Sequence, residues 1–267
     1  MVQRSISIQL IWTDRPFPQR AVAAAAAGFD LVDLWDRRTS DLDNLAKACA
    51  DNGIGINGFF GNRDHGLCDP AQRDAVLEEI GRNLDEAVRV GARQLHVFSN
   101  AIAEGGMVVP IPEVPRAAAI CVGLETLAAA AELAEGSGVQ LMLEHLNPVH
   151  LPGYLWDDAS VAGMVARQLD HPGVRAVFDT YHQQLGGGRL VDNLLSMWPW
   201  LGRIDIAGVP GRCEPGCGEI DFAYLNSVIT NKGWDGTVTF EVTPSDGNPD
   251  HAVEAINRLF HGGRVSA

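Results

Sequence analysis

Four acidic residues each lie within, or at the end of, a short apolar segment of the sequence: Glu144, Asp179, Asp205 and Glu241. A buried carboxylate without a partner is costly, so four of them in such segments indicate a shared cation. Successive side chains of a strand point to opposite faces, so the apolar neighbours would share one face and the acids the other. An acid at a strand end can also cap a helix or pair with an arginine. Four on one predicted face favour a metal site.

Oxygen ligands favour a hard cation, so the expected cofactor is one divalent metal ion, Mn²⁺ or Mg²⁺. Carboxylates with a nearby imidazole would also accept Co²⁺ or Zn²⁺. Strand alternation turns Glu144 and Glu241 inward, where they would oppose each other. Such a pair can hold the ion and also exchange protons with a substrate lying between them. We therefore expect Glu144 and Glu241 to be catalytic as well as metal-binding.

Three histidines are candidates for contact with a substrate. His182 follows Asp179 by three residues and could reach back over the strand end to a substrate oxygen. His150 follows the segment that ends in Glu144, and His96 would point inward if its own segment alternates as a strand. For each imidazole, a solvated, helix-capping or hydrogen-bonded core position is the alternative interpretation.

Residues 208–219 form a segment rich in glycine and proline, in which Arg212 is the one cation. Its planar guanidinium could bind an anionic or hydroxyl-rich substrate, or it could neutralise a neighbouring glutamate. Cys213 and Cys217 lie in the same segment. Two thiols at this spacing, without further cysteine or histidine nearby, are weak evidence for a metal site, so we interpret them as structural.

Short strand-like segments alternate with longer helical ones from one end of the chain to the other, in eight units. The predicted strands lie near residues 5–11, 29–35, 54–59, 93–98, 139–144, 174–179, 203–207 and 236–242. Eight such units close naturally into a (β/α)8 barrel, whose active sites lie at the carboxyl ends of the strands. A doubly wound open sheet is the alternative, but the first turn lacks its glycine fingerprint. No linker divides the chain, which predicts one domain over residues 1–267.

Composition narrows the classes of partner. A net charge of −14 without a local Lys/Arg cluster would repel a phosphate backbone, so we expect no nucleic acid partner. No apolar run approaches membrane-spanning length, which predicts no membrane partner. The first residues lack the features of a secretory signal, and the five cysteines are an odd number without paired spacing. A cytoplasmic protein with reduced thiols is therefore expected.

Several segments resemble the hydroxypyruvate isomerase family. They are Leu-Glu-His-Leu-Asn at 143–147, Leu-Pro-Gly-Tyr at 151–154, Phe-Asp-Thr-Tyr-His at 178–182, Pro-Gly-Arg-Cys-Glu-Pro-Gly-Cys-Gly-Glu-Ile at 210–220, and Phe-Glu-Val at 240–242. That family belongs to the xylose-isomerase-like TIM barrels, which also include ketose 3-epimerases, inosose dehydratases and endonuclease IV. The similarity is strongest from about Val139 to Pro244.

The resemblance implies one divalent ion held by the four acids, with Glu144 and Glu241 as acid and base. It places His182 and Arg212 at substrate contacts. The implied chemistry removes a proton α to a carbonyl, passes through a metal-stabilised cis-enediolate and returns the proton to the neighbouring or the same carbon. The expected partner is a small sugar or hydroxy-keto compound. Relatives are often dimers or tetramers, so a homo-oligomer is expected.

Two positions depart from the family pattern. Asp205 stands where a glutamine or histidine ligand is usual, and Gly208 stands where an acidic residue usually follows. The leading hypothesis is a metal-dependent isomerase of the aldose–ketose type. The runner-up is a ketose 3-epimerase, and a lyase or dehydratase on the same scaffold is a third alternative. A non-catalytic sugar-binding barrel also remains, because Asp205 could alter metal binding.

Overall fold

Eight strands, taken in sequence order, form a closed barrel in the computed structural model, which describes residues 2–111 and 113–260. The strands are β1 Gln3–Ser7, β2 Leu31–Asp33, β3 Gly55–Phe60, β4 Gln94–Val97, β5 Gln140–Glu144, β6 Val174–Asp179, β7 Leu201–Ile206 and β8 Thr237–Phe240. The pairings β1–β2, β1–β8, β3–β4, β4–β5, β5–β6 and β7–β8 are all parallel. The predicted (β/α)8 barrel is confirmed, and the open doubly wound sheet is excluded.

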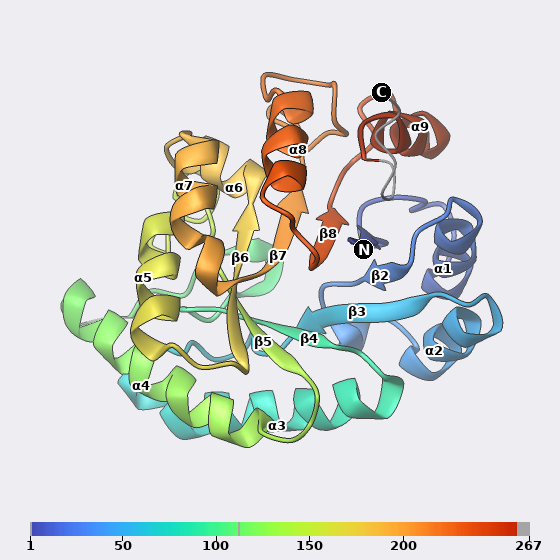
Figure 1. Ribbon diagram of the computed structural model, residues 1–267. Helices are drawn as coiled ribbons and strands as arrows, with labels where there is room; N and C mark the ends of the chain where they lie inside the picture. Colours follow the sequence, from blue (N-terminus) through green and yellow to red (C-terminus); the bar gives the residue numbers. More distant parts are fainter. Residues whose placement is uncertain (1, 112, 261–267) are drawn as a thin grey trace. The chain divides into compact units, whose positions relative to one another are not determined.

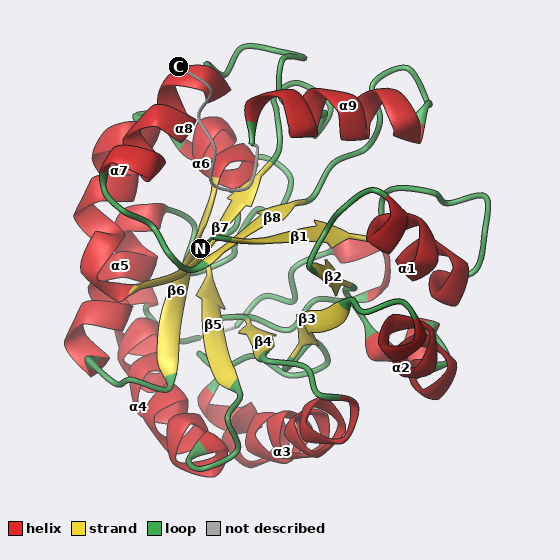
Figure 2. Cartoon of the chain, turned by 45° about the vertical axis from the view of Figure 1, so that its right-hand side comes forward, coloured by secondary structure: helices red, strands yellow, loops and turns green. Residues whose placement is uncertain are grey.

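Helices alternate with the strands along the chain (Figures 1 and 2). They are α1 Phe17–Ala26, α2 Leu42–Asp51, α3 Arg73–Val90, α4 Arg116–Ala134, α5 Ala159–Leu169, α6 Thr180–Gly186, α7 Leu190–Met197, α8 Phe222–Asn231 and α9 Pro249–Leu259. Four of them begin with a side chain that accepts a hydrogen bond from a backbone N–H of the first turn. These capping residues are Asp41 for α2, Asp158 for α5, Asp221 for α8 and Asn248 for α9. Such caps satisfy donors that the helix itself leaves unpaired.

One compact unit comprises the segments Met1–Asn57, Asp179–Tyr181 and Arg203–Ala267. Within it, Ser5 of β1 is aligned with Leu31 of β2 and with Thr239 of β8. Thr239 is in turn aligned with Asp205 of β7. Aligned residues of parallel strands point to the same face, so Ser5, Thr239 and Asp205 share a face at one level of the sheet.

The other compact unit comprises the segments Gly58–Phe178 and His182–Gly202. Within it, His96 of β4 is aligned with Phe60 of β3 and Met142 of β5. Glu144, the last residue of β5, is aligned with Val177 of β6. Both units are built from segments distant in the sequence. A single domain over residues 1–267 stays a prediction.

Helix α4 of this second unit bears on the predicted absence of a membrane partner, which stays a prediction. Its 19 residues are long and apolar enough to cross a membrane by length and composition, and 39% of that stretch is buried. This is weak evidence for a membrane span, because the core helix of a soluble protein meets the same criteria. Its packing is close: a Cβ at Gly123 would lie 2.4 Å from Sγ of Cys68.

Candidate active site

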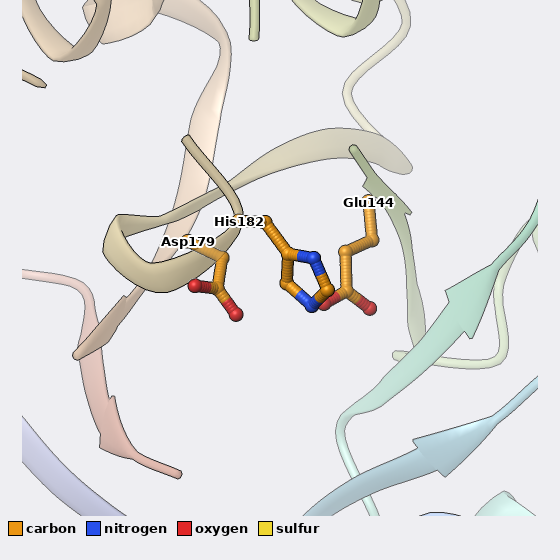
Figure 3. A group of neighbouring side chains, drawn as sticks. All are labelled: Glu144, Asp179 and His182. Carbon is orange, nitrogen blue, oxygen red and sulfur yellow. The ribbon is translucent and has the colours of Figure 1, made fainter. Parts of the chain in front are cut away.

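The four predicted metal ligands lie together. Glu144 ends β5, Asp179 ends β6, Asp205 is the second-last residue of β7, and Glu241 directly follows β8. All four side chains are buried, and each offers one oxygen within 4.8 Å of the others. A second group that meets the same criterion consists of Glu144, Asp179 and His182, whose side chains converge in Figure 3.

Arg212 contacts two of the four acids. Its Nη2 lies 3.4 Å from Oδ2 of Asp179 and donates to Oε2 of Glu241, while its Nε donates to the backbone oxygen of Glu241 at 3.3 Å. The guanidinium also lies 4.9 Å from the centre of the Tyr181 ring. Glu241 accepts a further hydrogen bond from the indole N–H of Trp35. The carboxylate of Glu241 is thus oriented by donors on two sides.

Arg203 of β7 binds the third acid. Its Nε donates to Oδ1 of Asp205 at 2.5 Å, and its Nη1 donates to Oδ1 of Asp33 at 2.5 Å. Asp33 also accepts from Ser5 Oγ and from Asn57 Nδ2, the latter at 3.1 and 3.2 Å. Burial opposes the charge of Arg203, but the carboxylates of Asp205 and Asp33 outweigh it, so the pKa of this guanidinium is raised. The arginine therefore carries a permanent positive charge.

Glu144 is oriented by a different partner. Nδ1 of His96 lies 2.7 Å from Oε2 of Glu144, and both side chains are buried. The backbone oxygen of Glu144 accepts from the hydroxyl of Tyr154 at 2.9 Å. Burial raises the pKa of Tyr154 well above its ordinary value, so the phenol stays a donor. Side chain and backbone of Glu144 are both fixed.

The hydrogen bonds of His182 determine its tautomer. The backbone N–H of Asn147 donates to Nδ1 of His182 at 3.0 Å. A backbone N–H is always a donor, so Nδ1 must accept and the proton of the neutral ring lies on Nε2. An Nε2–H group donates hydrogen bonds and does not bind a metal in that state. The geometry therefore favours four carboxylates, rather than the group with His182, as the ligand set.

Most of the predicted site residues come together, and one does not. Besides the four acids, Arg212, His96 and His182 each contact a residue of the site or offer an atom to it. His150 is exposed, and its backbone N–H donates to Oδ1 of Asn147. Neither group of candidate ligands among residues 2–111 and 113–260 includes it. It lies in the loop after β5, where strand alternation no longer dictates direction.

Two charged residues of the cluster were missed by the sequence analysis, Arg203 and Asp33. The signal for Arg203 was present, because it precedes Asp205 by two residues in one strand and so must share its face. Asp33 ends β2 in the same way that Asp179 ends β6. A buried arginine is rare without partners, and one partner of Arg203, Asp33, comes from a strand far away in the sequence.

Hydrogen bonds within the segment 208–219 connect its two ends. Gly208 and Cys213 exchange backbone hydrogen bonds, and the N–H of Glu219 donates to the oxygen of Val209. Sγ of Cys213 donates to the oxygen of Cys217 at 2.9 Å, and burial raises the pKa of Cys213 to about 12. The structural interpretation of these cysteines agrees with a protonated thiol that binds the backbone. A Cβ at Gly208 would lie 2.7 Å from the oxygen of Cys217, so no acidic side chain fits there.

The donor set suits a divalent cation. One oxygen from each of the four carboxylates lies within 4.8 Å of the others, and hard divalent cations such as Mg²⁺ take oxygen ligands. Two arginines contact three of the four carboxylates, and carboxylate oxygens are the ligands that a hard divalent cation prefers. Glu144, Asp179, Asp205 and Glu241 are the residues that would hold it.

Comparisons with known proteins agree with this fold. The family model described as "Xylose isomerase-like TIM barrel" matches residues 21–260. A 2-oxo-tetronate isomerase from Cupriavidus necator is 28% identical over 254 residues, covering 92% of this chain and 95% of the relative. A Streptomyces coelicolor protein, provisionally named hydroxypyruvate isomerase, is 29% identical over 284 residues. The match covers 98% of this chain and 97% of the relative.

One solved structure extends the comparison of the fold. An AP endonuclease of family 2 from Brucella melitensis superposes with a TM-score of 0.85 at 24% identity, covering 97% of this chain and 99% of that one. Fold and matching model define the class, and the chain belongs to the xylose isomerase-like TIM barrel family. Its curated relatives are named as hydroxypyruvate and 2-oxo-tetronate isomerases, which confirms the predicted resemblance and the enzyme class of isomerase.

Proposed function

We propose that the protein is a metal-dependent isomerase of a small sugar or hydroxy-carbonyl compound and works by proton transfer through an enediolate. The observation that carries the proposal is the set of four buried carboxylates, each with an oxygen within 4.8 Å of the others. Mn²⁺ or Mg²⁺ is the proposed cofactor, because an all-oxygen donor set favours hard cations. The names of the relatives support the isomerase class.

Glu144 and Glu241 are the proposed acid and base. A bound divalent ion would polarise the substrate carbonyl and stabilise the negative charge that develops on its oxygen. One glutamate removes the proton from the hydroxyl-bearing carbon next to the carbonyl, and a glutamate then returns a proton to the former carbonyl carbon. The hydroxyl proton moves to the former carbonyl oxygen, so the two carbons exchange their oxidation levels. Return to the original carbon from the opposite face would invert that carbon, which is the epimerase alternative.

His182 and Arg212 are the proposed substrate contacts. The tautomer of His182 presents an Nε2–H donor, which suits a hydroxyl or carbonyl oxygen. The guanidinium of Arg212 contacts Asp179 and Glu241 and packs over the ring of Tyr181. Its planar set of donors suits a carboxylate or a pair of hydroxyls. His96 acts on Glu144 in this proposal, by holding its carboxylate in place.

Two observations bear in opposite directions on the charge of the substrate. The relatives are named for 2-keto acids, and Arg212 is suited to bind a carboxylate. The net charge of −14 and the acidic cluster disfavour an anion. Relative rates for hydroxypyruvate and for neutral ketoses of similar size decide between them.

The test is proton NMR in heavy water, with Mn²⁺ or Mg²⁺ and a panel of small ketoses, aldoses and keto acids. An isomerase yields the aldose–ketose partner with deuterium at the exchanged carbon. An epimer, or an unsaturated product, would replace the proposal with an epimerase or a lyase. Full exchange in Glu144→Gln or Glu241→Gln would refute their roles, and binding without turnover of any compound would support a sugar-binding barrel.

A further inference from the structure

We propose that Arg203 is a positioning residue for Asp205, which it holds in place and whose charge it offsets, so that Asp205 serves as a ligand of the divalent ion. Asp33 anchors the other end of the same guanidinium. This inference rests on the proposed function, because it concerns the same metal site. It assigns a role to two charged residues that the proposed chemistry leaves unused.

The guanidinium is fixed at two points. Nε binds Oδ1 of Asp205, two residues further along the same strand, and Nη1 binds Oδ1 of Asp33 in β2, both at 2.5 Å. The guanidinium is planar and rigid, so fixing two of its nitrogens fixes its plane and the direction of its bonds. The orientation of the Asp205 carboxylate is therefore set by β2 as well as by its own strand.

Asp33 is itself held by neutral donors. Ser5 Oγ and Asn57 Nδ2 both donate to its carboxylate, and all three side chains are buried. Among the residues that the structure describes, Asp33 belongs to neither group of candidate metal ligands. Together with Ser5 and Asn57, it supports Arg203 rather than forming part of the ligand set.

The charges explain why such a support is needed at this site. Asp205 belongs to one group with Glu144, Asp179 and Glu241, so its carboxylate lies close to three others. Arg203 offsets the charge of Asp205, and because Asp33 shares the guanidinium, Asp205 keeps part of its attraction for a cation. A carboxylate has two oxygens with about four acceptor positions, so the bond from Nε to Oδ1 does not by itself exclude an ion at Asp205.

The opposite role is that Arg203 withdraws Asp205 from the metal, leaving three acids as ligands. The two roles predict different effects on metal affinity. If Arg203 positions Asp205, disturbing the arginine weakens binding, and only while Asp205 is present. If it withdraws Asp205, disturbing the arginine strengthens binding or leaves it unchanged.

The experiment measures the Mn²⁺ dissociation constant of chelator-treated protein by titration calorimetry and by electron paramagnetic resonance. The proteins are wild type, Arg203→Lys, Asp205→Asn and the double variant. Residues that hold a metal ligand typically change affinity by about 10–100-fold, so we expect Arg203→Lys to weaken binding about tenfold. In the Asp205→Asn background we expect the same change to have less than about a twofold effect, because its target is gone.

If Arg203 has a merely structural role, Arg203→Lys should weaken Mn²⁺ binding equally in the wild-type and Asp205→Asn backgrounds. That result, or tighter Mn²⁺ binding in Arg203→Lys, overturns the inference. Should Arg203→Lys fail to fold, Asp33→Asn replaces it, with the same expected dependence on Asp205. The matched control is Arg4→Lys, an arginine of β1 whose guanidinium donates to Asn257. Its Mn²⁺ affinity should equal that of wild type.

The proposed function and this inference fail in different ways. If the wild-type protein binds no divalent ion, both are overturned. If wild type binds Mn²⁺ and Glu241→Gln weakens that binding, while Arg203→Lys leaves it unchanged, the metal site stands and only the role of Arg203 is refuted.

Discussion

The two arginines of the acidic cluster are held in contrasting ways. Arg203 lies within β7, its side chain is 3% exposed, and its two carboxylate partners lie on strands. Arg212 lies in the segment 208–219, its side chain is 17% exposed, and its backbone adopts the left-handed region with φ 55°. One is part of the sheet, and the other is presented by a loop.

This difference suggests a supporting role for Arg203 and a substrate-binding role for Arg212. A charge that is locked by strand pairing can orient a ligand but has little freedom to follow a substrate. A charge on a partly exposed loop can bind a substrate and exchange one partner for another. We therefore expect changes around Arg203 to alter stability and metal affinity, and changes around Arg212 and Glu241 to alter turnover and substrate binding.

The largest effect is expected for Glu241→Gln, on the loop side of the comparison. Losing a general acid or base typically costs about 10²–10⁴ in rate, so deuterium exchange into substrate should fall by that factor. The measurement is the exchange rate by NMR at saturating Mn²⁺. The thermal unfolding temperature should stay close to that of wild type. A large loss of stability would contradict the distinction between the surroundings of Arg203 and those of Arg212 and Glu241.

The next effect is expected for Arg203→Met. This change leaves Asp33 and Asp205 buried without their cation, and breaking a buried pair in this way typically costs about 3–5 kcal/mol. The free energy of unfolding from urea denaturation measures it. The double variant Asp33→Asn/Arg203→Met, which removes one of the stranded charges, should recover part of the loss. Equal stabilities of wild type and Arg203→Met would contradict a support role.

Arg212→Met should have a smaller effect on stability and a clear effect on substrate binding. Its side chain is 17% exposed against 3% for Arg203, so we expect the free energy of unfolding to fall by less than in Arg203→Met. The KM for the substrate should rise about tenfold, because one charge-assisted contact is lost. Steady-state kinetics measure this value, and Arg212→Lys should recover only part of it if the planar fork matters. An unchanged KM would remove Arg212 from the substrate site.

The smallest effect is expected for Asp158→Ala, which lies outside both regions and serves as a reference for stability alone. Asp158 caps α5 by accepting from the N–H of Ser160, and losing such a cap costs about 1 kcal/mol. Burial acts to raise the pKa of Asp158, but the hydrogen bonds from Ser160 and Gln183 outweigh it and lower that pKa.

A lowered pKa fixes the direction of the pH dependence for Asp158. The stabilisation is present above the pKa of the unfolded chain and is lost as pH falls through the folded value. The difference between wild type and Asp158→Ala, measured by urea denaturation, should therefore shrink in strong acid. A difference that grows on acidification would contradict this assignment, and Mn²⁺ affinity should be unaffected throughout.

Periodicity in the sequence was sufficient to predict the barrel and the shared face of the four acids. Glu144, Asp179, Asp205 and Glu241 lie at or near the ends of their strands, where alternation decides which face a side chain takes. Arg203 obeys the same rule, but a charged residue inside a barrel is expected only when its partners are known. The partner Asp33 is 170 residues away, and only the closed order of strands brings it near.

The contacts of the histidines were beyond the reach of the sequence. His150, a predicted substrate contact, is exposed in the loop after β5, where strand alternation does not fix the direction of a side chain. The tautomer of His182 depends on a backbone N–H of the loop after β5, which no motif reports. Strand positions are fixed by a repeating geometry, whereas loop contacts depend on the individual path of the backbone.

The close packing of the backbone around Gly208 limits which residues can stand at this position. An aspartate or glutamate introduced there would collide with the oxygen of Cys217 unless the whole turn were rebuilt. The path of the backbone in residues 208–219 therefore requires glycine at position 208. A substitution there alone should destabilise the protein, whereas replacement of the entire segment avoids the collision.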